Sequence, residues 1–221
     1  MVDELRESHE SARLQALRLY RVLDTAGERT FDELAELAAA ICDTPISLIS
    51  LVDGDRQWFK SRVGLEVRET PRCMAFCAHA IETDAVLVVP DARLDPRFVD
   101  NPLVTGEPHI RLYAGTPLIV DGGHRLGTLC VIDRRPRSLT ASQIRGLQVL
   151  SRAVVTQLEL RRARLDIESL SQVLPVCAWC RSVRAGDGVW ESPERYLMDT
   201  VSVSHGICPQ CADMQPDPAA S

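Results

Sequence analysis

The sequence predicts an α+β fold in which helices flank an antiparallel sheet. Apolar residues recur at helical spacing in three segments, close to residues 9–23, 31–42 and 140–174. Between the second and third of these lie five short apolar segments that are joined mainly by tight turns, which is typical of strands. Helices placed before and after a series of hairpins favour an antiparallel sheet over a parallel one.

The first predicted hairpin contains the most apolar strand of the chain. Residues 46–52 are apolar on both faces of the pleat, and the turn Asp53-Gly54-Asp55 leads into a second strand over residues 57–63. A strand that is apolar on both faces is expected to be central in the sheet and covered on both sides. One face would carry Ile46, Leu48 and Val52, and the other Ile49 and Leu51.

The segment 64–110 is less regular and contains five prolines. Within it we expect one short helix at residues 75–81 and one short strand at 86–89. A second hairpin is predicted from strands 112–120 and 126–132, which flank the turn Asp121-Gly122-Gly123. Long irregular segments laid over a rigid sheet commonly carry recognition, so 64–110 is the expected location of a small-molecule pocket.

The helix predicted over residues 140–174 is longer than a small domain needs. Its apolar positions follow three-to-four spacing, close to a heptad seam, and Arg161 interrupts that seam. We therefore expect residues 140–155 to pack on the chain's own sheet and the outer part to pair with a second copy, giving a homodimer. The seam residues are Leu147, Leu150, Val154, Leu158 and Leu165.

Composition and charge indicate a cytoplasmic globular protein. The formal net charge is −6, the pI is about 5.4, and the positive charge is spread among acidic residues. No nucleic-acid partner and no membrane partner are expected, because both depend on clustered positive charge. The first ten residues do not resemble a secretory signal, and no apolar run approaches the ~20 residues of a membrane span.

The eight cysteines fall into two groups. Four are scattered through the first part of the chain, and four form two Cys-x-x-Cys pairs near the end. In a reducing compartment we expect thiols or metal ligands rather than disulfides. The scattered cysteines are Cys42, Cys73, Cys77 and Cys130, and the paired ones are Cys177, Cys180, Cys208 and Cys211.

The paired cysteines predict a small zinc-knuckle-like unit over residues 175–213. Tight spacing within each pair lets both thiolates reach one tetrahedral ion. A unit this small seldom folds without a metal, a disulfide or a partner, and structural zinc contributes on the order of 10 kcal/mol of apparent folding energy. An iron–sulfur cluster and a redox dithiol are the alternatives, the role of His205 is open, and residues 214–221 are expected to form a disordered tail.

Residues 13–165 resemble the GAF sensory domains of bacterial signalling proteins. Four phrases carry the resemblance: RLYRVLDTAGERTFDELAELAAAICDTPISLISLVDGDRQWFKSRVGL, ETPRCMAFCAHAI, VPDARLDPRFVDNPLVTG and RLYAGTPLIVDGGHRLGTLCVIDRRPR. The resemblance implies a sheet with helices on one side and a ligand cavity on the other. We thus expect a GAF domain over residues 1–139, its terminal output helix over 140–174, and then the four-cysteine unit.

Six residues are candidates for contact with a ligand in such a cavity, and each also has a purely structural interpretation. Aromatic residues are more often core, a histidine on a short helix is more often a partly buried structural residue, and an aspartate after a strand commonly caps a turn. The candidates are Trp58, Phe76, Cys77, His79, Asp91 and Arg97.

The function expected from these features is that of a sensory module without catalytic activity. It would bind a small molecule or a partner and relay its state through the output helix and the metal unit to a kinase or a response regulator. The alternative is a thiol-based redox enzyme or redox sensor that uses Cys73, Cys77 and Cys130, although Cys130 is expected inside an apolar strand, where a thiol is unreactive. Binding of a cyclic nucleotide also stays open, with no glycine loop or basic cluster to support it.

Overall fold

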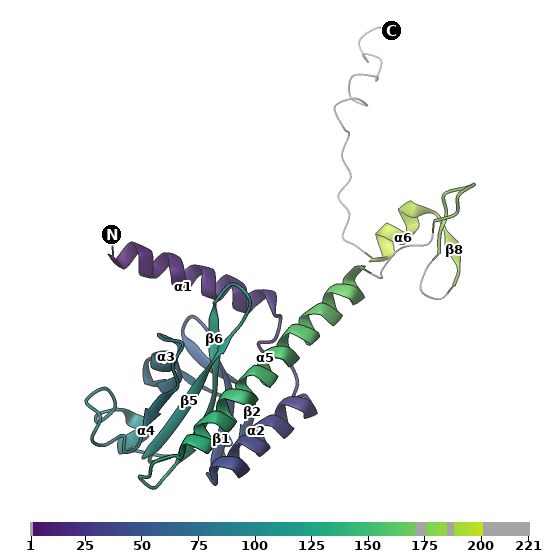
Figure 1. The fold of residues 1–221 in the computed structure, drawn as a ribbon. Coiled ribbons are helices and arrows are strands. Elements are labelled where there is room, and N and C mark those ends of the chain that lie inside the picture. The colour runs from purple at the N-terminus through teal and green to yellow at the C-terminus, as the bar shows by residue number, and fades with distance from the viewer. Residues whose placement is uncertain (1, 171–175, 185–187, 201–221) are drawn as a thin grey trace. The chain divides into compact units, whose positions relative to one another are not determined.

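The computed structural model describes residues 2–170, 176–184 and 188–200 (Figure 1). The chain divides into two compact units, residues 1–166 and 167–221. The predictions made for His205, Cys208, Cys211 and the tail 214–221 lie outside the described residues.

The first unit is an antiparallel sheet flanked by helices, which confirms the predicted fold class. Its six strands are ordered β3-β2-β1-β6-β5-β4, and every neighbouring pair is antiparallel. The prediction of five strands missed β3, the segment Glu69-Thr70-Pro71, because it contains none of the large apolar residues that identify a strand. The elements are α1 Val2–Leu19, α2 Arg29–Cys42, β1 Ile46–Val52, β2 Arg56–Val63, β3 Glu69–Pro71, the 3₁₀ helix Arg72–Met74, α3 Phe76–Ala80, β4 Leu87–Val89, α4 Pro102–Thr105, β5 Leu112–Ile119, β6 Arg125–Asp133 and α5 Ala141–Leu170.

The central strand β1 is buried on both faces, as predicted, and separates two apolar clusters. Ile49 and Leu51 belong to the cluster beneath α2 and α5, which lie side by side over one face of the sheet (Figure 1). Leu48 belongs to the cluster on the opposite face, which is covered by α3, α4 and the irregular segment 64–110. Neighbouring residues of β1 thus contact the helices on one face of the sheet and the segment 64–110 on the other.

Helix α5 packs on the sheet of its own chain over more of its length than predicted. Leu147, Leu150, Val154 and Leu158 are all buried in the helical-side cluster, so the packed part extends past residue 155. Arg161 then donates to the backbone oxygens of Tyr20 and Arg21 at 3.0 Å each, and its Nε lies 2.8 Å from the Glu28 carboxylate. The arginine that breaks the apolar seam is therefore a contact to the α1–α2 connection.

Glu28 also binds Lys60, whose side chain is fully buried in β2. The Lys60 ammonium donates to Glu28 Oε1 at 2.6 Å, to the Ala26 carbonyl at 2.8 Å and to Thr25 Oγ1 at 2.9 Å. All three acceptors lie in the connection between α1 and α2. One carboxylate thus joins β2 to α5, and a buried cation finds the partners that burial requires.

A second ion cluster ties α1 to the β2–β3 side of the sheet. Glu10 accepts hydrogen bonds from Arg13 and Arg72, and Arg13 also donates to the Val52 carbonyl at 2.7 Å. Partial burial disfavours the ionised carboxyl, but the two arginines outweigh it and lower the pKa of Glu10 to about 2.

In the second unit the structure describes a small hairpin and one helix. Strands β7 Val183–Arg184 and β8 Trp190–Glu191 pair in antiparallel fashion, and α6 spans Pro193–Thr200. An isolated bridge joins Val176 to Val183 and closes the turn that carries the first cysteine pair. Across the described residues of both units, no helix combines the length and the apolar character that crossing a bilayer requires.

Candidate functional site

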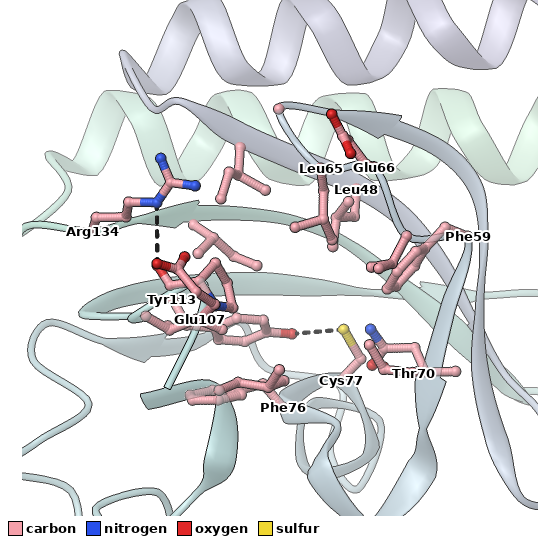
Figure 2. A pocket seen from close by; sticks show the side chains of 18 residues that line it. Leu48, Phe59, Leu65, Glu66, Thr70, Phe76, Cys77, Glu107, Tyr113 and Arg134 are labelled. Atoms are coloured by element: carbon pink, nitrogen blue, oxygen red, sulfur yellow. Dashed lines mark hydrogen bonds between the residues drawn. The ribbon is translucent and has the colours of Figure 1, made fainter. Parts of the chain in front are cut away.

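A cavity of about 470 Å³ lies on the loop-covered face of the sheet (Figure 2). This volume falls within the range of ~300–1,000 Å³ that is typical of small-molecule sites. Strands β1, β2, β5 and β6 form its floor, and segment 64–67, α3 and the chain after α4 form its walls. The lining residues are Ile46, Leu48, Gln57, Phe59, Gly64, Leu65, Glu66, Val67, Thr70, Phe76, Cys77, Leu103, Glu107, Pro108, Ile110, Tyr113, Ile132 and Arg134.

Most of this lining is apolar, and two buried polar atoms within it have no partner. Gln57 and Thr70 face each other across the β2–β3 pair. Gln57 is only 5% exposed, yet neither its Oε1 nor the Thr70 hydroxyl has a hydrogen-bond partner in the described part of the chain. Because an unpaired buried polar group costs free energy, this polar pair marks a place where a ligand could form hydrogen bonds.

Three charged side chains, all exposed, lie at the rim of the cavity. Glu66 and Glu107 contribute two carboxylates, and Arg134 contributes one guanidinium (Figure 2). Arg134 Nε donates to the Pro108 carbonyl at 3.1 Å, which fixes the guanidinium on the rim. The rim is thus more acidic than basic, and it disfavours an anionic ligand.

Cys77, on α3, joins the cavity wall to a cluster of hydroxyl groups. Its Sγ accepts hydrogen bonds from Ser50 Oγ at 3.1 Å, Thr128 Oγ1 at 3.0 Å and Tyr113 Oη at 3.3 Å. The Tyr113 bond crosses the base of the cavity in Figure 2. Cys130 Sγ on β6 lies 3.9 Å from Cys77 Sγ.

The two thiols differ in how readily they ionise. Burial raises the pKa of Cys77, but hydrogen bonds from Cys130 and the three hydroxyls stabilise the thiolate and bring the pKa to about 7. The hydrogen bond to Cys77, together with burial, raises the pKa of Cys130 well above its ordinary value. Hydrogen bonding in this pair therefore favours the thiolate on Cys77 over the thiolate on Cys130.

The six predicted ligand-contacting residues do not lie together. Phe76 and Cys77 line the cavity. His79 and Arg97 lie outside the lining, against the buried ring of Phe98: the His79 ring meets it edge-on at 5.0 Å, and the Arg97 guanidinium lies 5.1 Å from its centroid. The same Phe98 ring stacks on Phe76 at 4.0 Å, so it supports the cavity wall from behind.

Asp91 and Trp58 also lie outside the cavity lining. Asp91 accepts from the backbone N–H of Arg93 at 3.1 Å and binds its guanidinium, which lowers the pKa of Asp91. This is the turn-capping role that the sequence offered as an alternative. Trp58 is buried in the cluster beneath the helices, on the other face of the sheet.

Gln57, Thr70 and Phe98 were missed in the sequence. The turn 53–55 contained the signal for Gln57: a tight hairpin there pairs Val52 with Gln57 and Leu51 with Trp58. Paired residues of neighbouring strands point to the same face of a sheet, and the sequence had placed Leu51 and Val52 on opposite faces. Gln57 therefore belongs to the face of Val52, and Trp58 belongs to the face of Leu51.

The first of the two cysteine pairs lies on a turn in the second unit. Cys177 N–H donates to the Ser182 carbonyl at 2.8 Å, Arg181 N–H donates to the Cys177 carbonyl at 2.9 Å, and Arg181 has a φ of 60°. Cys180 is exposed and Cys177 partly so. Hydrogen bonds to the Ser182 side chain and backbone lower the pKa of Cys180 to about 7. Within the described residues, no three metal-ligating side chains come together.

Comparison with known families decides the identity of the first unit. A family profile described as the GAF domain matches residues 27–158, which is more than half of the chain. The chain belongs to the GAF family. Its order of elements and its cavity face agree with what the resemblance implied, and GAF sensory domains are components of signalling proteins.

Among curated proteins, the GAF chain resembles a cyclic di-GMP phosphodiesterase of Pseudomonas aeruginosa. The two are 46% identical over 143 residues, which cover 64% of this chain and 24% of the phosphodiesterase. This chain therefore spans about a quarter of the length of that relative.

Solved structures share the fold at low sequence identity. The GAF domain of a phosphoenolpyruvate-protein phosphotransferase from Coxiella burnetii has a TM-score of 0.53 at 15% identity, covering 69% of this chain and 95% of that one. A free methionine-R-sulfoxide reductase from Neisseria meningitidis, in complex with its substrate, has a TM-score of 0.52 at 17% identity, covering 66% and 87%. A domain of a two-component sensor histidine kinase protein from Sinorhizobium meliloti has a TM-score of 0.50 at 15% identity, covering 66% and 99%.

Proposed function

We propose that this GAF chain is a non-catalytic sensory module that binds a small molecule in its cavity and passes the bound state to a signalling protein. The observation that carries the proposal is the buried Oε1 of Gln57, which lies in the wall of a mostly apolar cavity and has no hydrogen-bond partner among the described residues. An apolar pocket with a few convergent polar groups is the usual form of a small-molecule site. The cytoplasm, where kinases and response regulators act, is the proposed location.

The lining favours one class of ligand. Phe59, Phe76 and Tyr113 offer aromatic surface, so a planar apolar body would be well packed. Gln57 Oε1 accepts hydrogen bonds, so the ligand would carry an N–H or O–H donor. With two carboxylates and one guanidinium at the rim, a neutral or cationic molecule is favoured over an anion.

The sheet provides a physical route from the cavity to α5. On β1, Leu48 lines the cavity and Ile49 packs beneath the helices; on β6, Ile132 lines the cavity and Val131 packs beneath the helices. Because successive side chains of a strand point to opposite faces, a shift that a ligand imposes on one face moves the packing of the other.

The output partner would be engaged through α5. Leu160 is 58% exposed on this helix, beyond the last residue buried in the core cluster. We infer that a second copy of the chain covers it, giving a homodimer from which a kinase or response regulator reads the signal. The likeness to one quarter of a much longer phosphodiesterase supports a regulatory part rather than a catalytic one.

A matched pair of probes tests the ligand site: indole, which has a ring N–H, and 1-methylindole, which lacks it. Titration calorimetry on the full chain is expected to show indole binding roughly three- to tenfold more tightly, because one net hydrogen bond is worth about 0.5–1.5 kcal/mol. Gln57→Leu should abolish the preference, whereas the remote exposed substitution Leu94→Ala should keep it. Binding of neither probe would contradict the cavity, and equal affinities in the native chain would contradict the role of Gln57.

We also propose that Cys177, Cys180, Cys208 and Cys211 hold one structural zinc ion. The proposal is supported by the turn of the first pair, where two accessible thiols three residues apart lie at the end of a closed hairpin. Elemental analysis of the purified chain should find about one zinc per chain, and Cys177→Ser with Cys180→Ser should remove it. Cys73→Ser, which changes an exposed cysteine of the other unit, is the control. Zinc retained by the double variant would refute the assignment.

A further inference from the structure

Two buried cysteines that the ligand-binding proposal does not explain lie in contact. Cys77 is 1% exposed and Cys130 is 0% exposed, and their sulfur atoms are 3.9 Å apart although 53 residues separate them in the chain. A disulfide needs a sulfur–sulfur distance of about 2.05 Å, so the two sulfurs must approach by roughly 2 Å. Rotation about a side-chain torsion moves a sulfur atom over a distance of this order.

The surroundings of Cys77 are those of a nucleophile. Ser50, Thr128 and Tyr113 direct three hydroxyl groups at its sulfur within 3.3 Å. Thiols react through the thiolate, and hydrogen-bond donors stabilise that form where water is excluded. Burial alone would raise the pKa of Cys77, whereas the hydrogen bonds from Cys130 and the three hydroxyls outweigh burial and lower it.

Cys42 shows what burial does in the same chain without such donors. It is fully buried in the helical-side cluster. Burial raises its pKa to about 11, although Arg137 opposes the shift. At neutral pH Cys42 is therefore a protonated, inert thiol, and it serves as an internal reference for Cys77.

Of the two contacting cysteines, Cys77 is the one that can be reached from the cavity. Cys77 lines the cavity, whereas Cys130 lies behind it on β6 and is absent from the lining. A molecule as small as a hydroperoxide fits a space of about 470 Å³ with room to orient. An incoming oxidant therefore meets Cys77 first, and Cys130 is positioned for a second step.

We propose that Cys77 is a hydroperoxide-reactive residue and that Cys130 resolves the product to a disulfide. The Cys77 thiolate attacks one peroxide oxygen: an S–O bond forms, the O–O bond breaks, and the departing oxyanion takes a proton to become water or an alcohol. Cys77 is oxidised to a sulfenic acid, and the hydroperoxide is reduced. The Cys130 thiol then attacks this sulfur, an S–S bond forms, and the hydroxyl group leaves with the thiol proton as water. A dithiol reductant restores both thiols.

The reaction would change the same wall that the proposed ligand contacts. In the disulfide, Cys77 Sγ carries no negative charge, so the Tyr113 hydroxyl loses its charged acceptor at the base of the cavity. The inference nevertheless does not rest on the ligand-binding proposal, because a hydroperoxide needs only to reach Cys77.

The test is oxidation of the full chain by hydrogen peroxide followed by peptide mass spectrometry. After brief exposure, peroxide is removed with catalase, and the denatured chain is alkylated and digested. The expected product is a peptide pair linked through Cys77 and Cys130 that dithiothreitol separates, while Cys42 is alkylated at every dose. In Cys130→Ser, dimedone should instead capture a sulfenic acid on Cys77. The proposal is overturned if Cys77 stays as unreactive as Cys42, or if its disulfide partner is Cys73.

A second measurement separates activation by the hydroxyl groups from simple proximity. Tyr113→Phe removes one donor and keeps the ring, so the pKa of Cys77 should rise. The higher pKa would slow peroxide oxidation near pH 7 by roughly two- to fivefold and move the midpoint of the rate–pH profile upward. A purely structural role of Tyr113 would leave that midpoint in place, and an unchanged midpoint would refute activation by this hydroxyl.

Discussion

Lys60→Met removes a buried cation while keeping the length and apolar stem of the side chain. In the native chain the Lys60 ammonium is completely shielded from solvent and makes three hydrogen bonds to the α1–α2 connection, one of them to Glu28. Methionine fills a similar volume and donates none of these bonds. The substitution therefore isolates the polar contribution of this side chain.

The expected loss of unfolding free energy depends on whether the charge of Glu28 stays compensated when Lys60 is removed. Breaking a buried ion pair typically costs ~3–5 kcal/mol when the remaining charge is left unpaired. Here Glu28 keeps Arg161 at 2.8 Å and is 40% exposed, so its charge stays compensated. Hydrogen bonds to charged groups are worth ~1.5–3 kcal/mol each, and the relieved desolvation of Lys60 offsets part of their sum. We expect the free energy of unfolding to fall by about 2–3 kcal/mol, which lowers Tm by roughly 4–12 °C in a chain of this size.

Urea unfolding followed by far-ultraviolet circular dichroism measures this loss. The matched control is Arg29→Met, which removes the same charge from an ion pair to Glu33 in which Arg29 is 91% exposed. The control should lose less than about 0.5 kcal/mol, because solvent screens an exposed pair. Equal losses for the two variants would refute the reasoning that burial of Lys60 determines its contribution.

Three further predictions concern α1, the strand ends and α5. Glu10→Gln should lower the free energy of unfolding by about 1 kcal/mol at neutral pH, a value discounted because Glu10 is partly exposed. The pKa of Glu10 in the folded chain is lowered from 4.5 to about 2, so its stabilisation is complete above pH 4.5 and is lost as the pH falls toward 2. Urea titrations should therefore show the difference in unfolding free energy between the variant and the native chain decreasing over that pH range. Gly64→Ala should cost about 2–3 kcal/mol in the same assay, because Gly64 has a φ of +70° and an added Cβ would meet the Pro45 carbonyl oxygen. Leu147→Ala, at a fully buried position, should cost about 2–5 kcal/mol, whereas Val149→Ala, at a position that is 51% exposed, should stay within about 0.5 kcal/mol; similar losses for both would mean that α5 is not packed as described.

The fold was predictable because its elements repeat simple periods. The bounds of β1 came from an apolar run that ends at the turn 53–55, the assignment of its two faces came from the strand pleat, and both are confirmed. The three residues of β3 carry no period, and their pairing with β2 is fixed by tertiary contacts. Arg161 was interpreted as an interruption of the apolar seam, because its acceptors on the α1–α2 connection are 133 to 141 residues away in sequence and no local pattern shows them.

The candidate site was less predictable, because it depends on which side chains converge. Phe76 and Cys77 are placed in the cavity, while His79 and Arg97 surround Phe98 instead. Cys130 was expected to be inert inside an apolar strand. Its own high pKa agrees with that expectation, but its contact with Cys77 gives it a partner that sequence spacing cannot reveal.

Lys60 is the single lysine of the sequence, and its amine is wholly enclosed. Reagents and enzymes that acylate lysine side chains thus find no target on the folded chain. Acylation of Lys60 must wait until the α1–α2 connection lifts from β2, so its rate reports how often that region opens. The rate of Lys60 acylation is therefore a measure of local opening, and a ligand that stabilises the contact between β2 and the α1–α2 connection would lower this rate.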